Sequence, residues 1–359
     1  MPEDSAPERG DPPAPRRPFY ALLADTSPLD LRLIGRTLLH AAIIGAVAGV
    51  MAVLFFGALE LMEELVLGGL AGYKPLRADG EKVFSHLVES PTVRLWLLPI
   101  IPAAGALVGG ILTAKVAPEA AGGGGNAMIT AFHQHGGMNR DDFESDALIP
   151  ALLASVVSYS IFISVYGEST LFAHAAHFPF FQAHLPLYAL FALLLSLLAI
   201  VFLNTLTGVK KLSLRLPGPA WMRPGVRGLA LGIFCAFVLW FVDSKLNTPG
   251  QGIGLLGSGY GAVQVSITGA SWLPLGWTGV ELLLLLCGAK LVAASLTLGS
   301  GGSAGDFAPS LMLGGLLGGA FSRAAQLLLH DPRIDPGAFA LVGMGTFYGV
   351  SPTRPSALS

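Results

Sequence analysis

Long runs of apolar residues, separated by short polar stretches, dominate the chain from about residue 37 onward. About 20 mainly apolar residues are enough to cross a bilayer as a helix. The clearest runs of this kind are 37–59, 95–115, 147–166, 186–208, 228–243 and 278–299. The pattern therefore predicts an all-α polytopic membrane protein.

Three further apolar stretches depart from a simple span. Residues 307–329 and 337–350 are rich in glycine and less regular, which is typical of short, broken or re-entrant helices. Residues 254–268 are apolar but too short to span comfortably. The glycines of the first stretch allow close helix packing. They are Gly314, Gly315, Gly318 and Gly319.

Polar segments flank the apolar region and set the domain organisation. Residues 1–33 are polar and rich in proline, and they lack the basic start and short apolar core of a secretory signal peptide. We interpret them as a disordered cytoplasmic tail. Residues 34–350 then form the transmembrane domain, and residues 351–359 form a short polar tail.

The charges of the loops predict the orientation. The loop 209–227 carries only basic charges, whereas the loop 167–185 has no Lys or Arg. Basic loops lie on the cytoplasmic side of a membrane. The first loop is therefore expected inside and the second outside, and alternation places the N-terminus in the cytoplasm. The basic residues of the inner loop are Lys210, Lys211, Arg215, Arg223 and Arg227.

The composition is typical of a membrane protein and argues against a soluble protein and against a nucleic-acid-binding protein. Only 12% of residues are charged, 53% are hydrophobic, and the mean hydropathy is +0.65. Soluble domains carry roughly 25% charged residues. With a net charge of −2 there is no basic bias, so we expect no nucleic-acid partner. Cys235 and Cys287 lie in apolar stretches, which favours small core residues over a disulfide.

Four consecutive glycines, Gly122–Gly125, precede Asn126 and a short helical stretch. Such a run does not suit a helix interior. It suits a loop that presents backbone N–H groups at a helix N-terminus, where an anion binds readily. A plain glycine-rich linker is the alternative.

A second glycine-rich element, residues 300–309, follows directly after an apolar run. Pro309 suits the first turn of the helix that continues from Ser310, and Ser303 or Asp306 could cap that helix. Irregular backbone at membrane depth is tolerated only where protein buries it or water reaches it. Broken helices whose N-termini point at an anion are known from transporters.

The element Gly305–Pro309 resembles the CLC family of chloride channels and chloride/proton antiporters, because it matches that family's GxFxP element at its fixed positions. The flanks Ser295–Gly299 and Leu311–Gly314 are similar to the family as well. Residues 122–126 stand where the family has GSGIP, but only Gly122 and Gly124 match. The family's chloride-coordinating serine falls on Gly123.

The resemblance implies a CLC-like fold with broken and re-entrant helices, and chloride as the transported ligand. It implies transport across a membrane by a voltage-gated-type chloride channel or a chloride/proton antiporter. Chloride would be held by helix N-termini and by loop backbone N–H groups. The candidate anion-binding residues are Gly123, Gly124, Gly125, Gly305, Phe307 and Ala308.

The chain also departs from the family. The G[K/R]EGP element with the gating glutamate is missing, and the chain is apparently shortened near residues 140–141, so the inverted repeats are incomplete. The family's last helices are missing too, which leaves incomplete the interface of the homodimer that the resemblance implies. A non-transporting degenerate paralogue or a membrane assembly partner is therefore the alternative function.

Other chemistry is poorly supported by the sequence. His174, His177 and His184 lie close together, but no carboxylate or cysteine pattern joins them, so we expect no metal site and no cofactor. Serine, histidine and aspartate at catalytic spacing are not evident, so we expect no enzyme. Glu281 opens a predicted span, and we weighed an interface position against a proton-relay role for it.

Overall fold

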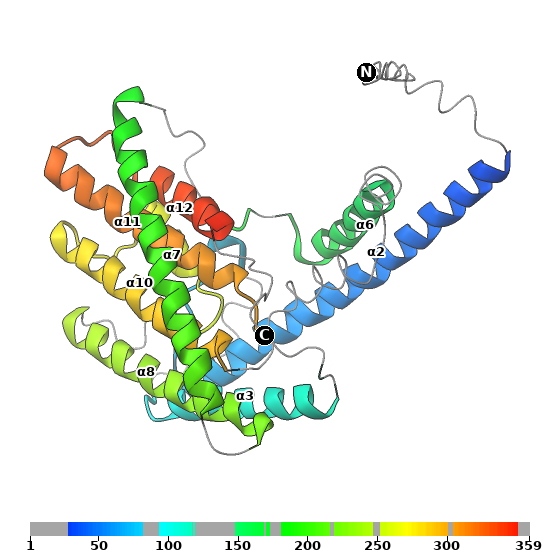
Figure 1. Cartoon of the computed structure of the whole chain (residues 1–359), viewed down its shortest axis with the longest axis horizontal. Helices are drawn as coiled ribbons and strands as arrows, with labels where there is room; N and C mark the ends of the chain where they lie inside the picture. Colours follow the sequence, from blue (N-terminus) through cyan, green and yellow to red (C-terminus); the bar gives the residue numbers. More distant parts are fainter. Residues whose placement is uncertain are drawn as a thin grey trace, which may run out of the picture. The chain divides into compact units, whose positions relative to one another are not determined.

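The computed structural model of the chain describes residues 28–81, 93–116, 118, 148–168, 170–172, 181–215, 219–246, 252–300 and 304–350. All regular secondary structure in these residues is helical, which confirms the predicted all-α class (Figure 1). The chain divides into two compact units. The first comprises Met1–Leu54 with Met138–Gly167, and the second comprises Phe55–Gly137 with Glu168–Ser359.

The long helices coincide with the predicted apolar runs, and within the described residues 7 helices are long and apolar enough to cross a membrane. They lie at α2 Pro28–Met62, α3 Leu97–Lys115, α6 Leu148–Tyr166, α7 Leu185–Leu214, α8 Arg223–Leu246, α10 Trp277–Leu298 and α11 Phe307–Leu329. Shorter helices are α9 Tyr260–Thr268 and α12 Pro336–Val350. Single 3-10 turns lie at Asp79–Glu81, Gln182–His184 and Ala220–Met222.

Helix α2 is longer than the apolar run 37–59 that predicted it. It begins at Pro28, inside the segment that the sequence assigned to the tail. At its other end it continues as a π-helix, Glu63–Leu70. The added turns carry acidic residues, so hydropathy alone ended the helix too early.

In the first unit, helix α6 packs against the first part of α2. The backbone of Ala154 lies against Gly45, at a point where no side chain would fit. The hydroxyl of Tyr166 donates a hydrogen bond of 2.7 Å to the carbonyl of Val53. The small residue allows the two apolar helices to approach closely, which is how helices associate inside a membrane.

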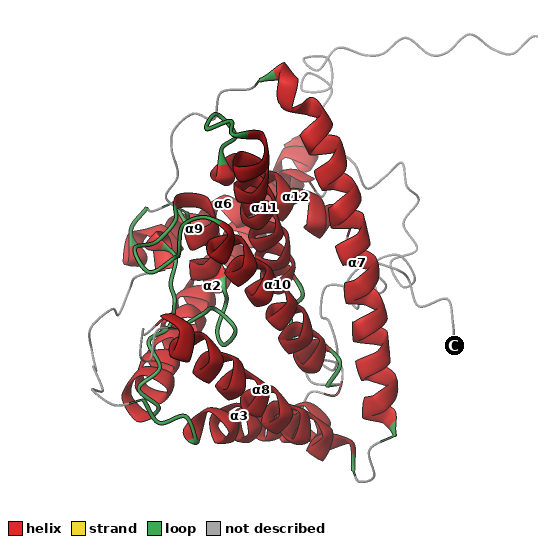
Figure 2. Ribbon diagram, turned by 90° about the vertical axis from the view of Figure 1, so that its left-hand side faces the viewer, coloured by secondary structure: helices red, strands yellow, loops and turns green. Residues whose placement is uncertain are grey.

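In the second unit, α11 and α12 pack backbone against backbone (Figure 2). A Cβ atom on Gly314 would collide with the carbonyl of Gly343, and a Cβ atom on Gly318 would collide with the carbonyl of Phe339. The expectation of a short, broken or re-entrant helix at residues 307–329 is wrong, because α11 is one uninterrupted helix of 23 residues. Its glycines serve close packing, as predicted. Helices α3 and α8 form a second such pair, in which Gly228 lies against the backbone of Pro102.

The short helix α9 lies beside α11 and follows an irregular loop, residues 252–259. Gly254, Gly257 and Gly259 in this loop have φ of 74°, 81° and 85°, which favours glycine. At the other end of α9, Arg323 Nη1 donates a hydrogen bond of 3.1 Å to the carbonyl of Ser266. A cationic side chain thus stabilises the carbonyl end of a helix that is too short to span.

We predict that Gly343→Ala destabilises the protein, whereas Gly345→Ala, on the same helix, does not. The first methyl group meets the backbone of α11, and overpacking costs about 1–3 kcal/mol. The second meets open space, where alanine favours a helix by about 1 kcal/mol over glycine. Thermal unfolding in detergent measures both variants. Equal stability of the two would contradict the close packing of α11 against α12.

Candidate anion site

The candidate site lies where α10 ends and α11 begins. The last turn of α10 closes with hydrogen bonds from the N–H of Gly299 to the carbonyl of Ser295, at 2.9 Å, and from the N–H of Ser300 to the carbonyl of Thr297, at 3.2 Å. Gly299 lies against the side chain of Val209 from α7. These contacts fix the point at which the chain leaves α10. Residues 301–303 lie outside the described residues.

Helix α11 begins at Phe307, so Pro309 stands in its first turn, as the sequence predicted. The N–H groups of Phe307 and Ala308 have no acceptor inside the helix, because they belong to its first turn. Both Ser310 N and Ser310 Oγ donate to the carbonyl of Asp306, at 3.1 Å and 2.7 Å. Two donors at the start of α11 therefore remain for a ligand.

Asp306 stands at the N-cap position of α11, but its side chain makes no capping hydrogen bond. The prediction that this carboxylate caps the helix is therefore wrong. The cause is local, because a capping side chain accepts from the second or third N–H of its helix, and the third position here is Pro309, which has no N–H. The carboxylate, which is exposed, leaves the first N–H groups of α11 unoccupied.

The electrostatics of this helix end favour an anion. The aligned peptide dipoles place roughly half a positive charge at a helix N-terminus. Gly305 and Phe307 are exposed and Ala308 is half-buried, so the donors can be reached. The ring of Phe307 packs edge-on against the ring of Tyr348 from α12, at 5.0 Å between ring centres. This contact joins the start of α11 to the end of α12.

The other three predicted residues, Gly123, Gly124 and Gly125, lie outside the described residues. The structure therefore brings together only Gly305, Phe307 and Ala308. The junction near residues 140–141 also lies outside the described residues, so the predicted internal shortening is not tested.

A buried lysine in α10 supports the loop beside the site, and the sequence analysis missed it. Lys290 is only 4% exposed. Its ammonium group donates hydrogen bonds to three carbonyls of the loop, at 3.0 Å to Gly254, 3.4 Å to Leu255 and 3.5 Å to Gly257. An ammonium group has three N–H donors, and the loop offers three carbonyl groups that accept no hydrogen bond within a helix, so the numbers of donors and acceptors match. A single lysine within an apolar span was the available signal.

The polar continuation of α2 forms a second network that the sequence analysis missed. Arg77 contacts Glu64 at 3.2 Å and Glu60 at 3.8 Å. Nearby, the hydroxyl of Ser258 donates to Glu81 at 2.8 Å. The two glutamates of α2 are buried with their arginine partner, which explains why the helix extends beyond its apolar run. Glu281, the carboxylate that the sequence singled out, is exposed.

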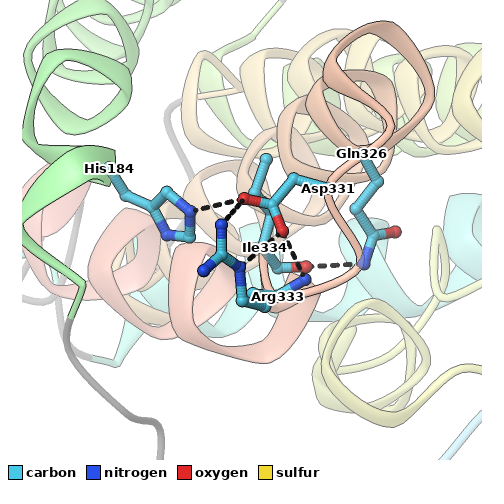
Figure 3. Close-up of polar contacts among 5 residues, drawn as sticks. All are labelled: His184, Gln326, Asp331, Arg333 and Ile334. Atoms are coloured by element: carbon cyan, nitrogen blue, oxygen red, sulfur yellow. Dashed lines mark hydrogen bonds and ion pairs between the residues drawn. The ribbon is translucent and has the colours of Figure 1, made fainter.

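His184, one of the histidines considered as metal ligands, lies within hydrogen-bond distance of an aspartate instead. Its Nε2 atom lies 3.3 Å from Asp331 in the connection between α11 and α12 (Figure 3). Arg333 binds the same carboxylate through two side-chain contacts of 2.9 Å and 3.1 Å. Among the described residues there is no group of three or more His, Cys, Asp or Glu that could hold a metal ion. His174 and His177 lie outside them.

Comparisons with known proteins identify the family of the chain and proteins that are similar to it. The family described as "Voltage gated chloride channel" matches residues 138–355. The H(+)/Cl(−) exchange transporter ClcA of Vibrio vulnificus is 41% identical over 76 residues, which is 21% of this chain and 16% of the relative. The chloride channel protein CLC-f of Arabidopsis thaliana is 31% identical over 206 residues, 54% of this chain and 24% of the relative. The matched stretches thus span less than a quarter of these two relatives.

A solved structure shares the fold. The crystal structure of a slow cyanobacterial Cl−/H+ antiporter superposes with a TM-score of 0.61 at 15% sequence identity. The superposition covers 88% of this chain and 85% of the antiporter. At this identity the likeness establishes the arrangement of the helices.

We predict that Lys290→Met destabilises the loop 252–259. Methionine fills the space but donates no hydrogen bond, so three carbonyls lose their partner, at a cost of about 1–3 kcal/mol. Lys245→Met, at the exposed end of α8, is the matched control. Thermal unfolding and limited proteolysis measure both. If the two variants were equally stable, the lysine would not support the loop.

We also predict that acid weakens the contact between α7 and the α11–α12 connection. Arg333, by hydrogen bonding, and His184 hold the pKa of Asp331 well below its ordinary range. The ionised carboxylate therefore stabilises the fold above its ordinary pKa of about 4, and this contribution is lost as the pH falls below that value.

The unfolding temperature of the wild-type chain should fall as the pH is lowered below about 4. In Asp331→Asn this fall should be smaller, because asparagine does not titrate. Glu168→Gln, which removes an exposed carboxylate, serves as the control. Unchanged acid sensitivity in Asp331→Asn would show that this carboxylate does not contribute.

Proposed function

Because the chain belongs to the voltage-gated chloride channel family, we propose that this multi-pass membrane protein carries chloride across a membrane, with the anion held by backbone N–H groups. The observation that carries the proposal is the start of α11. There, the N–H groups of Phe307 and Ala308 have no acceptor within the helix, and the side chain of Asp306 does not cap them. Removing chloride from water costs free energy unless hydrogen-bond donors of this kind replace the water molecules that surround it.

The surroundings of the site support the proposal in two ways. The last turn of α10 is held by backbone hydrogen bonds and by the close contact of Gly299 with α7, and the start of α11 is held by the hydrogen bonds of Ser310 to the carbonyl of Asp306. Donors on helix ends held in this way are ordered before an ion binds, which lowers the cost of binding. Asp306 also leaves these donors free, because its side chain caps nothing. We propose Gly305 as the third backbone donor, and Gly123, Gly124 and Gly125 as the second anion element.

Orientation and assembly belong to the same proposal. The basic loop between α7 and α8 supports a cytoplasmic N-terminus by the positive-inside rule. The relatives' names include both a chloride channel and a H(+)/Cl(−) exchange transporter. We propose chloride as the transported ion for either mode. A homodimer remains a prediction from the family resemblance.

The proposal predicts that liposomes containing the purified chain release chloride faster than protein-free liposomes. Ala308→Pro should slow this release about tenfold or more, because it removes one N–H donor to an ion. Proline is tolerated in the first turn of a helix, so the fold is expected to survive. Ala308→Ser keeps the donor and serves as the matched control. A chloride electrode follows release, and a pH electrode in the same chamber detects any coupled proton movement.

Two outcomes would contradict the proposal. Release equal to that of protein-free liposomes, from protein shown to be monodisperse and helical, would favour the alternative of a non-transporting membrane partner. Equal release by Ala308→Pro and Ala308→Ser would show that transport does not use the start of α11.

A further inference from the structure

A buried arginine stands near the basic end of α8, at a position that the sequence pattern placed in the inner loop. Arg227 is only 5% exposed and lies in the second turn of the helix. At 1.5 Å per residue, it lies about 6 Å along the helix from Arg223. Arg227 therefore lies one turn inside the end of α8 that follows the basic loop.

The guanidinium group of Arg227 is only partly satisfied. Its Nη2 atom donates a hydrogen bond of 3.2 Å to the carbonyl of Val209 in α7. Its Nε atom is buried and has no hydrogen-bond partner. In the described part of the chain no carboxylate pairs with Arg227 or with Arg223. A buried guanidinium without a counter-charge is costly, and none of the described residues supplies one, so an anion from outside the protein would stabilise this position.

Two more donors lie around Arg227. Arg223 stands one turn earlier on the same face of α8, and its Nε atom is also buried without a partner. Ser213 stands one turn beyond Val209 on α7, is 5% exposed, and its hydroxyl has no partner either. The unsatisfied groups on these two neighbouring turns can all donate, which indicates an anion and excludes a cation.

The helix dipoles distinguish this cluster from ordinary basic residues at a membrane surface. Lys210 and Lys211 lie at the C-terminal end of α7, where the dipole favours a positive charge. Arg223 and Arg227 lie at the N-terminal end of α8, where the dipole opposes a positive charge. An anion between them is favoured by the helix end and by both guanidinium groups at once.

We propose that Arg223, Arg227 and Ser213 form a binding site for a phosphate group, which an anionic phospholipid headgroup supplies from the cytoplasmic leaflet. Guanidinium is suited to phosphate because its donors match two phosphate oxygens. The position of Arg227, one turn from the basic end of a helix long enough to span a membrane, suits a phosphate anchored at the headgroup level. Exposed Lys210, Lys211 and Arg215 add a more diffuse attraction to anionic lipid.

The test uses the purified full chain in detergent and compares the retention of phosphatidylglycerol with that of phosphatidylcholine by native mass spectrometry. We expect the wild-type chain to retain phosphatidylglycerol preferentially. Arg227→Gln should weaken this binding about tenfold, the loss expected from one charge-assisted hydrogen bond. Arg215→Gln, which removes an exposed charge from the same end, is the matched control and should lose less.

In a second experiment, inorganic phosphate or chloride is added in place of the lipid. The rise in the unfolding temperature of the protein measures the binding of each anion. Protection by phosphate that is lost in Arg227→Gln and retained in Arg215→Gln supports the site with a soluble source. Selective retention of phosphatidylglycerol, with no protection by phosphate, supports the lipid source. Equal losses in the two variants would overturn the proposal, because a diffuse charge effect predicts them. Protection by chloride alone would also overturn it.

Arg223→Gln keeps the test decisive if Arg227→Gln does not fold. Arg223 is half-buried and makes no hydrogen bond to the described residues, so its loss leaves no protein group unpaired. Weaker binding of phosphatidylglycerol than in Arg215→Gln is the expected result. Size exclusion and circular dichroism establish that each variant is folded.

Discussion

Every backbone N–H and carbonyl group at membrane depth needs a hydrogen-bond partner. In this structure the informative positions are the helix ends and the irregular loop, where a helix does not provide that partner. The loop 252–259 leaves three carbonyls, and Lys290 donates to them. The end of α9 leaves another carbonyl, and Arg323 donates to it. The start of α11 leaves N–H groups instead, and no acidic side chain accepts from them. These carbonyls are thus paired with cationic side chains of the chain, whereas the amide end of α11 is the proposed site for an anion from outside.

Glycine is what allows these irregular segments to be held so closely. In α11 and α12, glycines let two backbones touch, so that the end of α12 comes beside the start of α11. In the loop 252–259, glycines adopt positive φ, so that the carbonyls converge on Lys290. The same residue type therefore serves two physical purposes, close approach and unusual backbone geometry. Composition shows only that glycine is abundant.

The sequence predicted the spans well because about 20 consecutive apolar residues are a strong local signal. It failed where the deciding contact was distant. Helix α2 extends past residue 59 because Glu64 meets Arg77, and no local pattern reveals that pairing. The role of Lys290 depends on carbonyls more than 30 residues away. The start of α11 was correctly placed by Pro309, yet the predicted capping role of Asp306 was wrong, because the same proline removes an N–H that a capping side chain could accept from.

A site built from main-chain donors has an unusual pattern of vulnerability. Nearly any residue at position 308 supplies the same N–H, so most substitutions within the site leave its chemistry intact. The sensitive positions are instead glycines such as Gly314 and Gly343, which hold α11 in place by backbone contact. Harmful missense changes in this protein should therefore concentrate at helix-crossing points remote from the ion. A survey of variants restricted to ion-contacting residues would overlook most of them.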